Sequence, residues 1–235
     1  MIAGDQPKIF ADNVVAAVSS RNDGNMSFSK GDHAKTVQNR VIFLKKTDID
    51  PEHTTLVRVT YENVEHFARY KIISDVDKAE GMLDATSELV ADALVVTKPG
   101  HALFLPLADC VGAIIYDSKQ HILMVSHLGR HSTEQQGATK SIQYFIDQFD
   151  TDTNDMKVWL SPAVGQETYP LKTLNDSSLQ DAILEQLLTA NIPRQNIELS
   201  DIDTATNENY FSHSQFLAGN REEDGRFAIV AMMHE

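Results

Sequence analysis

The chain has 235 residues, 42% of them hydrophobic and 23% charged, so it can bury a sizeable core and has the composition of a globular protein. Its formal net charge of -14, with no basic run, argues against a nucleic-acid partner. No apolar stretch approaches the ~18 residues of a membrane helix, and no signal peptide is evident, so we expect no membrane partner. A single cysteine excludes an internal disulfide framework and predicts a cytoplasmic protein. We expect residues 1–235 to form one domain.

The first part of the chain predicts strands on either side of one helix. The expected strands are residues 8–19, with a turn at Asp12 and Asn13, then 54–61 and 69–74. Asp32 can cap a helix that runs to about Leu44, with Val37 and Val41 beside Leu44 on its buried face. Pro51 lies beyond the end of that helix.

The rest of the chain predicts a group of buried strands and two helices. Apolar runs at 101–110, 111–117 and 121–129 are bounded by Gly, Pro, Asp and Lys, which is typical of strands. Shorter strands are expected at 93–97, 158–160, 197–199 and 227–233. Helical spacing covers residues 133–149 and 177–190, the second helix with Leu179, Ile183, Leu187 and Leu188 facing inward. Because strands come in groups and do not alternate regularly with helices, we expect an α+β fold with mixed sheets and flanking helices.

The polar residues at the ends of the apolar runs are the candidates for chemistry. Cys110 closes one run, and His127 and His131 follow the next one. A thiol beside an imidazole is either an activated nucleophile or half of a soft-metal site, although a lone cysteine can also be a small buried hydrophobe. Asp109, directly before the cysteine, adds a carboxylate that is costly to bury unless it is paired. The remaining histidines expected on the solvated surface are His33, His53, His101, His121 and His234.

Several short segments, taken in order, carry a family resemblance. They are Ser20-Arg21 with Asp23-Gly24, Asp32 through Asn39-Arg40, 92–97, Leu107-Ala108-Asp109-Cys110, 126–129, 160–165 with Tyr169, 203–206, 210–212 and Gly225-Arg226-Phe227-Ala228. In this order the chain resembles the YfiH/DUF152 family, also called multicopper polyphenol oxidoreductase or laccase-domain proteins. The resemblance implies a single domain of mixed sheets, similar in core to a deamidating bacterial toxin domain.

The resemblance also implies an activity. Known activities of the family are phosphorolysis of purine nucleosides and hydrolytic deamination of adenosine, and one bacterial branch is credited with editing peptidoglycan precursors. An older label is copper-dependent phenol oxidation, but one cysteine and scattered histidines do not supply the several copper centres of a laccase. We therefore expect a purine nucleoside and phosphate as small-molecule partners.

The family's metal site, usually zinc, uses one cysteine and two histidines. Matched to this chain by motif, the resemblance implies that Cys110 and His127 are metal ligands. It also implies that these two residues and Asp109 are catalytic. The family's first histidine is replaced here by Tyr61, whose phenol is a poor ligand because its ordinary pKa is about 10. The sequence leaves the third ligand of a zinc or copper ion open among His66, His131 and His213.

Several mechanisms remain open at this point. Phosphate can attack the ribose, with Arg21, Arg40, Arg130 and His131 as candidates for binding it, although Arg21 and Arg40 can equally form structural ion pairs. A metal-bound hydroxide can deaminate a purine, with Asp109 moving protons. Without metal, the cysteine and histidine can act as a hydrolase, and a degenerate member can bind a small ligand without turnover. The family's closing Phe-Ser-Tyr-Arg-Arg motif reads Phe-Ser-His-Ser-Gln at 211–215, so two family arginines are absent.

Overall fold

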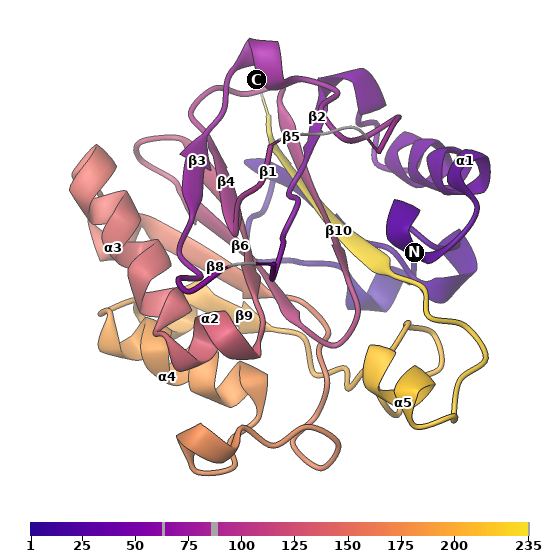
Figure 1. Ribbon diagram of the computed structural model, residues 1–235. Coiled ribbons are helices and arrows are strands. Elements are labelled where there is room, and N and C mark those ends of the chain that lie inside the picture. The colour runs from indigo at the N-terminus through magenta and orange to yellow at the C-terminus, as the bar shows by residue number, and fades with distance from the viewer. Residues whose placement is uncertain (63, 86–88, 235) are drawn as a thin grey trace.

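The computed structural model describes residues 1–62, 64–85 and 89–234, and it contains two mixed β-sheets (Figure 1). The four-stranded sheet has the order β1 (Val14–Val18), β10 (Phe227–Met233), β5 (Ala102–Leu107) and β2 (Thr54–Leu56). The six-stranded sheet has the order β3 (Tyr70–Ile72), β4 (Ala93–Val96), β7 (Ile122–Leu128), β6 (Val111–Asp117), β8 (Met156–Leu160) and β9 (Ile197–Leu199). The pairs β2–β5, β3–β4 and β8–β9 are parallel, and the other pairs are antiparallel.

Helices cover both outer faces of the two sheets. The α-helices are α1 (His33–Lys45), α2 (Arg130–Glu134), α3 (Gly137–Phe149), α4 (Leu179–Thr189) and α5 (His213–Leu217). Short 3₁₀ segments lie at Ala3–Asp5, Arg21–Asp23, Phe28–Lys30, Pro51–His53, Asp75–Asp77, Thr153–Asp155, Lys172–Leu174 and Arg194–Asn196. Figure 1 shows α1 on one side of the molecule and α3 and α4 on the other, with the sheets between them. None of the helices in the described residues has the length and apolar character that crossing a bilayer requires.

The core divides into three apolar clusters that follow these layers. Side chains from both sheets form one cluster, with Ile114 and Val125 meeting Leu105 and Ile229. A second cluster joins the outer face of the six-stranded sheet to α3 and α4, and a third joins the outer face of the four-stranded sheet to α1. The expected α+β fold with mixed sheets and flanking helices is confirmed.

Strand β7 shows how the two-residue repeat of a strand positions the site. Leu123 and Val125 point into the cluster between the sheets, whereas Met124 and Leu128 point toward the helices. His127 continues the first series, so the alternation that buries the core also turns its imidazole to the inter-sheet side of the sheet.

Several predicted boundaries and faces were wrong. The first strand begins only at Val14, because residues 9–12 form turns, and the strands expected at 54–61 and 69–74 shorten to β2 and β3. The helix expected over 133–149 divides into α2 and α3 at Gln136, whose φ of 64° lies in the left-handed region.

Burial also differs from expectation at four positions. Helix α1 begins at the predicted cap, where the Asp32 carboxylate accepts a bond from the Lys35 N–H, but Val41 is 37% exposed and Val37 only half-buried. Its buried face consists of Thr36, Arg40, Phe43 and Leu44. Leu188 in α4 is 41% exposed, and His101 is buried, where its imidazole hydrogen-bonds the Thr55 hydroxyl at 2.7 Å.

Candidate functional site

The register of β6 and β7 brings Cys110 and His127 to one face. Val111 pairs with Leu128 and Gly112 pairs with His127. The same register continued by one residue places Cys110 opposite Gly129. Because residues two apart share a face, the Cys110 and His127 side chains point to the same side of the sheet.

Both side chains border the space beside Gly129. A methyl group on Gly129 would lie 2.9 Å from Cε1 of His127 and 3.1 Å from Sγ of Cys110. Burial raises the pKa of the Cys110 thiol to about 11 and lowers the pKa of His127 to about 4. Both groups are therefore neutral at neutral pH.

Tyr61 completes a cluster of three with these residues. Its hydroxyl lies 3.4 Å from Nε2 of His127, and it also interacts with the Cys110 thiol. Its ring lies 5.7 Å from that of Phe67 and 6.1 Å from that of His131. The pKa of Tyr61 is raised, first by desolvation and then by Cys110, so the phenol keeps its proton. Tyr61 thus lies beside Cys110 and His127. This is the place at which the family resemblance implies that a tyrosine replaces a metal-binding histidine.

Asp109 does not contact the imidazole of His127 in this arrangement. Its φ of 76° turns the chain between β5 and β6. Its carboxylate accepts one bond from the Thr204 hydroxyl at 2.8 Å and another from the Ser214 N–H at 2.6 Å. Asp109 therefore joins three distant segments, including the start of α5, beside the cysteine.

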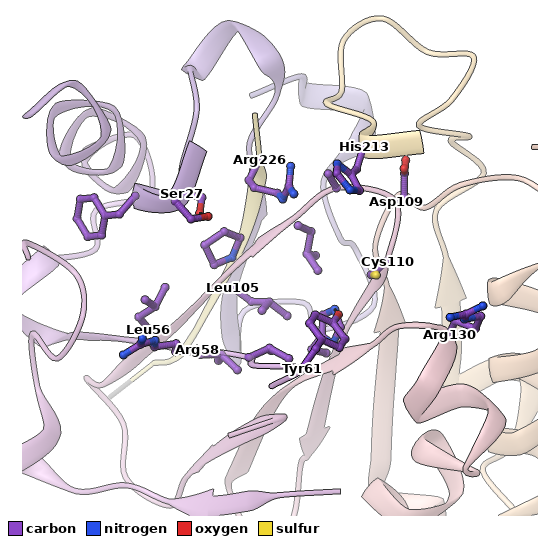
Figure 2. A pocket seen from close by; sticks show the side chains of 18 of the residues that line it. Ser27, Leu56, Arg58, Tyr61, Leu105, Asp109, Cys110, Arg130, His213 and Arg226 are labelled. Carbon is purple, nitrogen blue, oxygen red and sulfur yellow. Dashed lines mark hydrogen bonds between the residues drawn. The ribbon is translucent and has the colours of Figure 1, made fainter. Parts of the chain in front are cut away.

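A cavity of about 840 Å³ opens over this cluster (Figure 2). Figure 2 shows Ser27 toward one end and Arg130 toward the other, with Tyr61 and Cys110 nearer Arg130. Among the described residues, the charged or titratable side chains that line it include Arg40, Arg58, Arg130 and Arg226, then His127, His131 and His213, against Asp84 and Asp109. The cavity is thus rich in cationic groups, although the whole chain is acidic.

Arg40 and Arg21 differ in their relation to this cavity. Arg40 lines it but is only 1% exposed, and its guanidinium donates to the carbonyls of Met26, Gly81 and Met82. Burial lowers its pKa to about 10, so it remains charged. Arg21 is not among the described lining residues, and its guanidinium pairs with Glu223 at 3.5 Å.

Two arginines of the cavity were missed by the sequence analysis. Arg226 donates to Asp224 at 2.7 Å, and His213 bonds the same carboxylate at 2.8 Å. Arg226 belongs to the Gly-Arg-Phe-Ala segment that carries the family resemblance, which was the available signal. Arg58 follows β2, and no motif pointed to it.

The donors present do not fit a three-ligand zinc or copper site. Within the described residues, no three His, Cys, Asp or Glu side chains come together as a metal site would require. His66 lines a separate hollow with Thr60 and Arg69, and Nδ1 of His213 is bonded to Asp224. The place beside Cys110 and His127 is taken by the phenol of Tyr61, a poor ligand while it is protonated.

The fold and site define an α+β protein with a cation-lined cavity over a cysteine, a histidine and a tyrosine. The family model for the multi-copper polyphenol oxidoreductase laccase matches residues 16–174, well over half of the chain. The chain therefore belongs to this family, which confirms the family expected from its motifs.

Known proteins similar to this chain agree with that assignment. A purine nucleoside phosphorylase of Bacteroides thetaiotaomicron is 24% identical, over 87% of this chain and 83% of that protein. The structure of YlmD from Geobacillus stearothermophilus aligns with a TM-score of 0.86 at 20% identity, over 100% of this chain and 98% of that one. The structure of the hypothetical protein YfiH from Bacillus licheniformis aligns with a TM-score of 0.83 at 20% identity, over 96% and 98%. These two structures confirm the fold.

Proposed function

We propose that this protein is a purine nucleoside phosphorylase, an enzyme that cleaves nucleosides with inorganic phosphate. The observation that carries the proposal is the charge of the cavity, where four arginines face two aspartates among the described lining residues of a chain whose net charge is -14. Guanidinium groups hold phosphate through charge-assisted hydrogen bonds. The relative named a purine nucleoside phosphorylase supports the choice of nucleoside.

The proposed reaction exchanges one bond for another. An oxygen of phosphate forms a bond to C1′ of the ribose while the bond from C1′ to N9 of the purine breaks. The electron pair of that bond goes to the purine, which takes up at N7 the proton that hydrogen phosphate gives up, and the products are ribose 1-phosphate and the free base. The protein has to hold phosphate in line with C1′ and hydrogen-bond the departing base.

In the proposal, two groups of lining residues bind the two parts of the substrate pair, the purine and the phosphate. We assign Cys110, His127 and Tyr61 to the purine, because neutral donors and acceptors suit the polar edge of a base. We assign Arg130 and His131, which adjoin this cluster, to phosphate.

Three further residues have supporting roles in the proposal. Arg226, which lines the cavity, contributes to the field that attracts phosphate. Arg40 completes the positive lining from a buried position. Asp109 is a positioning residue that holds the start of α5 at the cavity. The thiol of the single cysteine fits a reducing compartment, so we place the reaction in the cytoplasm.

Other reactions of the family are supported less well by this geometry. Deamination of adenosine by a metal-bound hydroxide needs a three-ligand site, and the donors in the described part of the chain do not form one. Metal-free amide or acyl transfer, including peptidoglycan editing, needs a thiolate, whereas burial raises the pKa of Cys110. A member that binds a nucleoside without turnover is separated from an enzyme by the assay below.

The test is turnover of adenosine and inosine by the purified protein with and without phosphate. We expect free base and ribose 1-phosphate to appear only with phosphate. The variants Cys110→Ala and His127→Ala should each lower kcat/KM by roughly a hundredfold, and Arg130→Met should raise the KM for phosphate by roughly tenfold.

The matched control is His53→Ala, because His53 is exposed and is not among the described residues that line the cavity. This variant should retain the parent rate. Equal background rates in the parent protein and all variants would contradict the proposal, and ammonia release from adenosine without phosphate would favour the deaminase.

A further inference from the structure

We propose that Tyr61 makes the Cys110–His127 pair a metal-free site, because its hydroxyl takes the edge of the imidazole at which a shared metal ion would bind. Tyr61, Cys110 and His127 then form a hydrogen-bonded cluster in place of a metal centre. The proposal concerns the site of the proposed function but does not rest on the reaction assigned to it.

The first step of the argument concerns the free edge of His127. The Cε1 and Nε2 atoms lie 2.9 and 3.5 Å from the Cβ position of Gly129, which is also 3.1 Å from Sγ of Cys110. This edge of the ring therefore faces the sulfur, and a metal shared by the two residues would bind Nε2. Nε2 is the atom that lies 3.4 Å from the Tyr61 hydroxyl. Whichever atom donates the proton in that contact, a metal ion would have to displace the Tyr61 hydroxyl from Nε2.

The second step concerns the other potential ligands around the cluster. Asp92 is bound by Arg69, whose Nη2 and Nε donate to its two oxygens at 2.7 and 2.8 Å. That carboxylate is therefore already neutralised by a cation. It is not free to move toward the sulfur without leaving the guanidinium unpaired.

His131 is occupied in a different way. Its ring is stacked on Phe67 with a centroid distance of 5.2 Å and an interplanar angle of 15°. Its Nε2 lies 3.4 Å from Nη2 of Arg130, whose positive charge opposes a second cation at the same nitrogen. No neighbour among these described residues replaces the missing third ligand.

The third step concerns the surroundings of Tyr61, which is 53% exposed but lies against three rings. The Tyr61 ring contacts the rings of Phe67, His131 and His127, with centroid distances of 5.7, 6.1 and 6.2 Å. A histidine at position 61 would start from the same backbone and lie among the same rings. It would replace a protonated phenol by a neutral imidazole nitrogen, which is a good zinc ligand.

The test compares metal binding by the parent protein and by Tyr61→His, with no activity assay. Each is purified without added metal, analysed for zinc and copper, and then titrated with Zn²⁺ and with Co²⁺. We expect the parent protein to hold well under one metal ion per chain. We expect Tyr61→His to bind one Zn²⁺ roughly a hundredfold more tightly and to show the thiolate-to-cobalt absorption band.

Two further variants make the comparison specific. Tyr61→Phe removes the hydroxyl without adding a ligand, so it should stay as metal-poor as the parent protein. Tyr61→His combined with Cys110→Ser should lose the cobalt band. Circular dichroism shows that each variant is folded before it is titrated.

Stoichiometric metal in the parent protein that is lost in His127→Ala would overturn the proposal. So would equal zinc affinity in the parent protein and a folded Tyr61→His, because Tyr61 would then not be what excludes the ion. A metal-free parent protein that fails to cleave nucleosides would instead contradict the proposed function and leave this inference standing.

Discussion

At the scale of single residues, Gly129 is the position that the Cys110–His127 pair depends on most directly. Gly129→Ala places a methyl group 2.9 Å from Cε1 of His127 and 3.1 Å from the Cys110 sulfur, closer than ordinary contact. Both side chains must then shift away from the added methyl group. We expect the free energy of unfolding to fall by about 1–3 kcal/mol, and nucleoside turnover to fall at least tenfold, if the proposed function holds.

The measurement is urea denaturation of the parent protein and the variant, followed by the phosphorolysis assay. Gly4→Ala is the matched control, because a Cβ on Gly4 meets nothing within 4 Å. The control should stay within about 0.5 kcal/mol of the parent protein. A Gly129→Ala protein as stable as the control would show that the close approach is absent.

His101 is the residue from which we expect a measurable dependence of stability on pH. Burial lowers its pKa from 6.5 to about 4, and Lys78 lowers it further, against the raising effect of Asp75 and Asp77. The unfolded chain therefore binds this proton more readily than the folded protein does. The contribution of the neutral ring is complete above pH 6.5 and is lost as the pH falls toward 4.

At pH 5 this difference amounts to about 2 kcal/mol of lost stability relative to pH 7.5. His101→Gln can keep a hydrogen bond to Thr55 without titrating, so its loss of stability over the same range should be smaller by about that amount. Urea midpoints at several pH values measure it. Parallel pH profiles for the two proteins would contradict the assignment.

At the scale of elements, one buried side chain joins three helices. Gln186 in α4 donates to the carbonyl of Thr133 in α2 at 2.7 Å and accepts from the N–H of Ala138 in α3 at 3.1 Å. Gln186→Leu keeps the bulk but leaves both backbone groups without this partner. We expect a loss of about 2–4 kcal/mol in the free energy of unfolding.

The comparison for this prediction is Gln143→Leu in α3. Gln143 is exposed and bonds only the nearby Asp147 in the described residues, so its replacement should cost under about 1 kcal/mol. Thermal or urea unfolding of both variants provides the measurement. Equal effects at the two positions would mean that the buried amide does not hold the helices together.

Several elements could be predicted from the sequence because their signal is local. The apolar runs that became β5, β6 and β7 and the cap at Asp32 are examples. The buried face of α1 could not be predicted, because it depends on Arg40, a charged residue that binds carbonyls of other segments. The strand expected over 54–61 ends at Leu56, and Arg58 beyond it forms an isolated bridge with Val90.

At the scale of the whole molecule, Gly112 marks a close approach of the two sheets. A Cβ on Gly112 would lie 2.5 Å from Cδ1 of Ile229 and 2.6 Å from Cδ1 of Leu107. Both neighbours are buried in the cluster between the sheets. We expect Gly112→Ala to reduce the free energy of unfolding by about 1–3 kcal/mol.

Ile229→Val is the second substitution for testing this prediction, because it removes Cδ1 of Ile229, the atom that would lie nearest to the added methyl group. In a double-mutant cycle, Gly112→Ala should cost less in the Ile229→Val background than in the parent protein, by about 1 kcal/mol. Additive effects of the two changes would show that the sheets can separate at this point at little cost.

The same scale explains how much of the site could be predicted. Cys110 and His127 share a face because of strand alternation and register, and their motifs pointed to them. The approach of Arg226 and Arg58 to that pair depends on how two sheets pack, which residue spacing within one strand does not determine. Asp109 was expected at the reaction, but its carboxylate is committed to the Thr204 hydroxyl and the Ser214 N–H.

The hydrogen bonds of Asp109 have a consequence for how the substrate range of this protein can change. Asp109 binds the start of α5 to the turn that carries Cys110, while Phe216 and Leu217 at the end of α5 are exposed. Exchanging residues 215–223 for a different loop would change the entrance to the cavity and would keep the hydrogen bond from the Ser214 N–H to Asp109. Selectivity for bulkier or differently charged molecules could then change without disturbing the residues beneath.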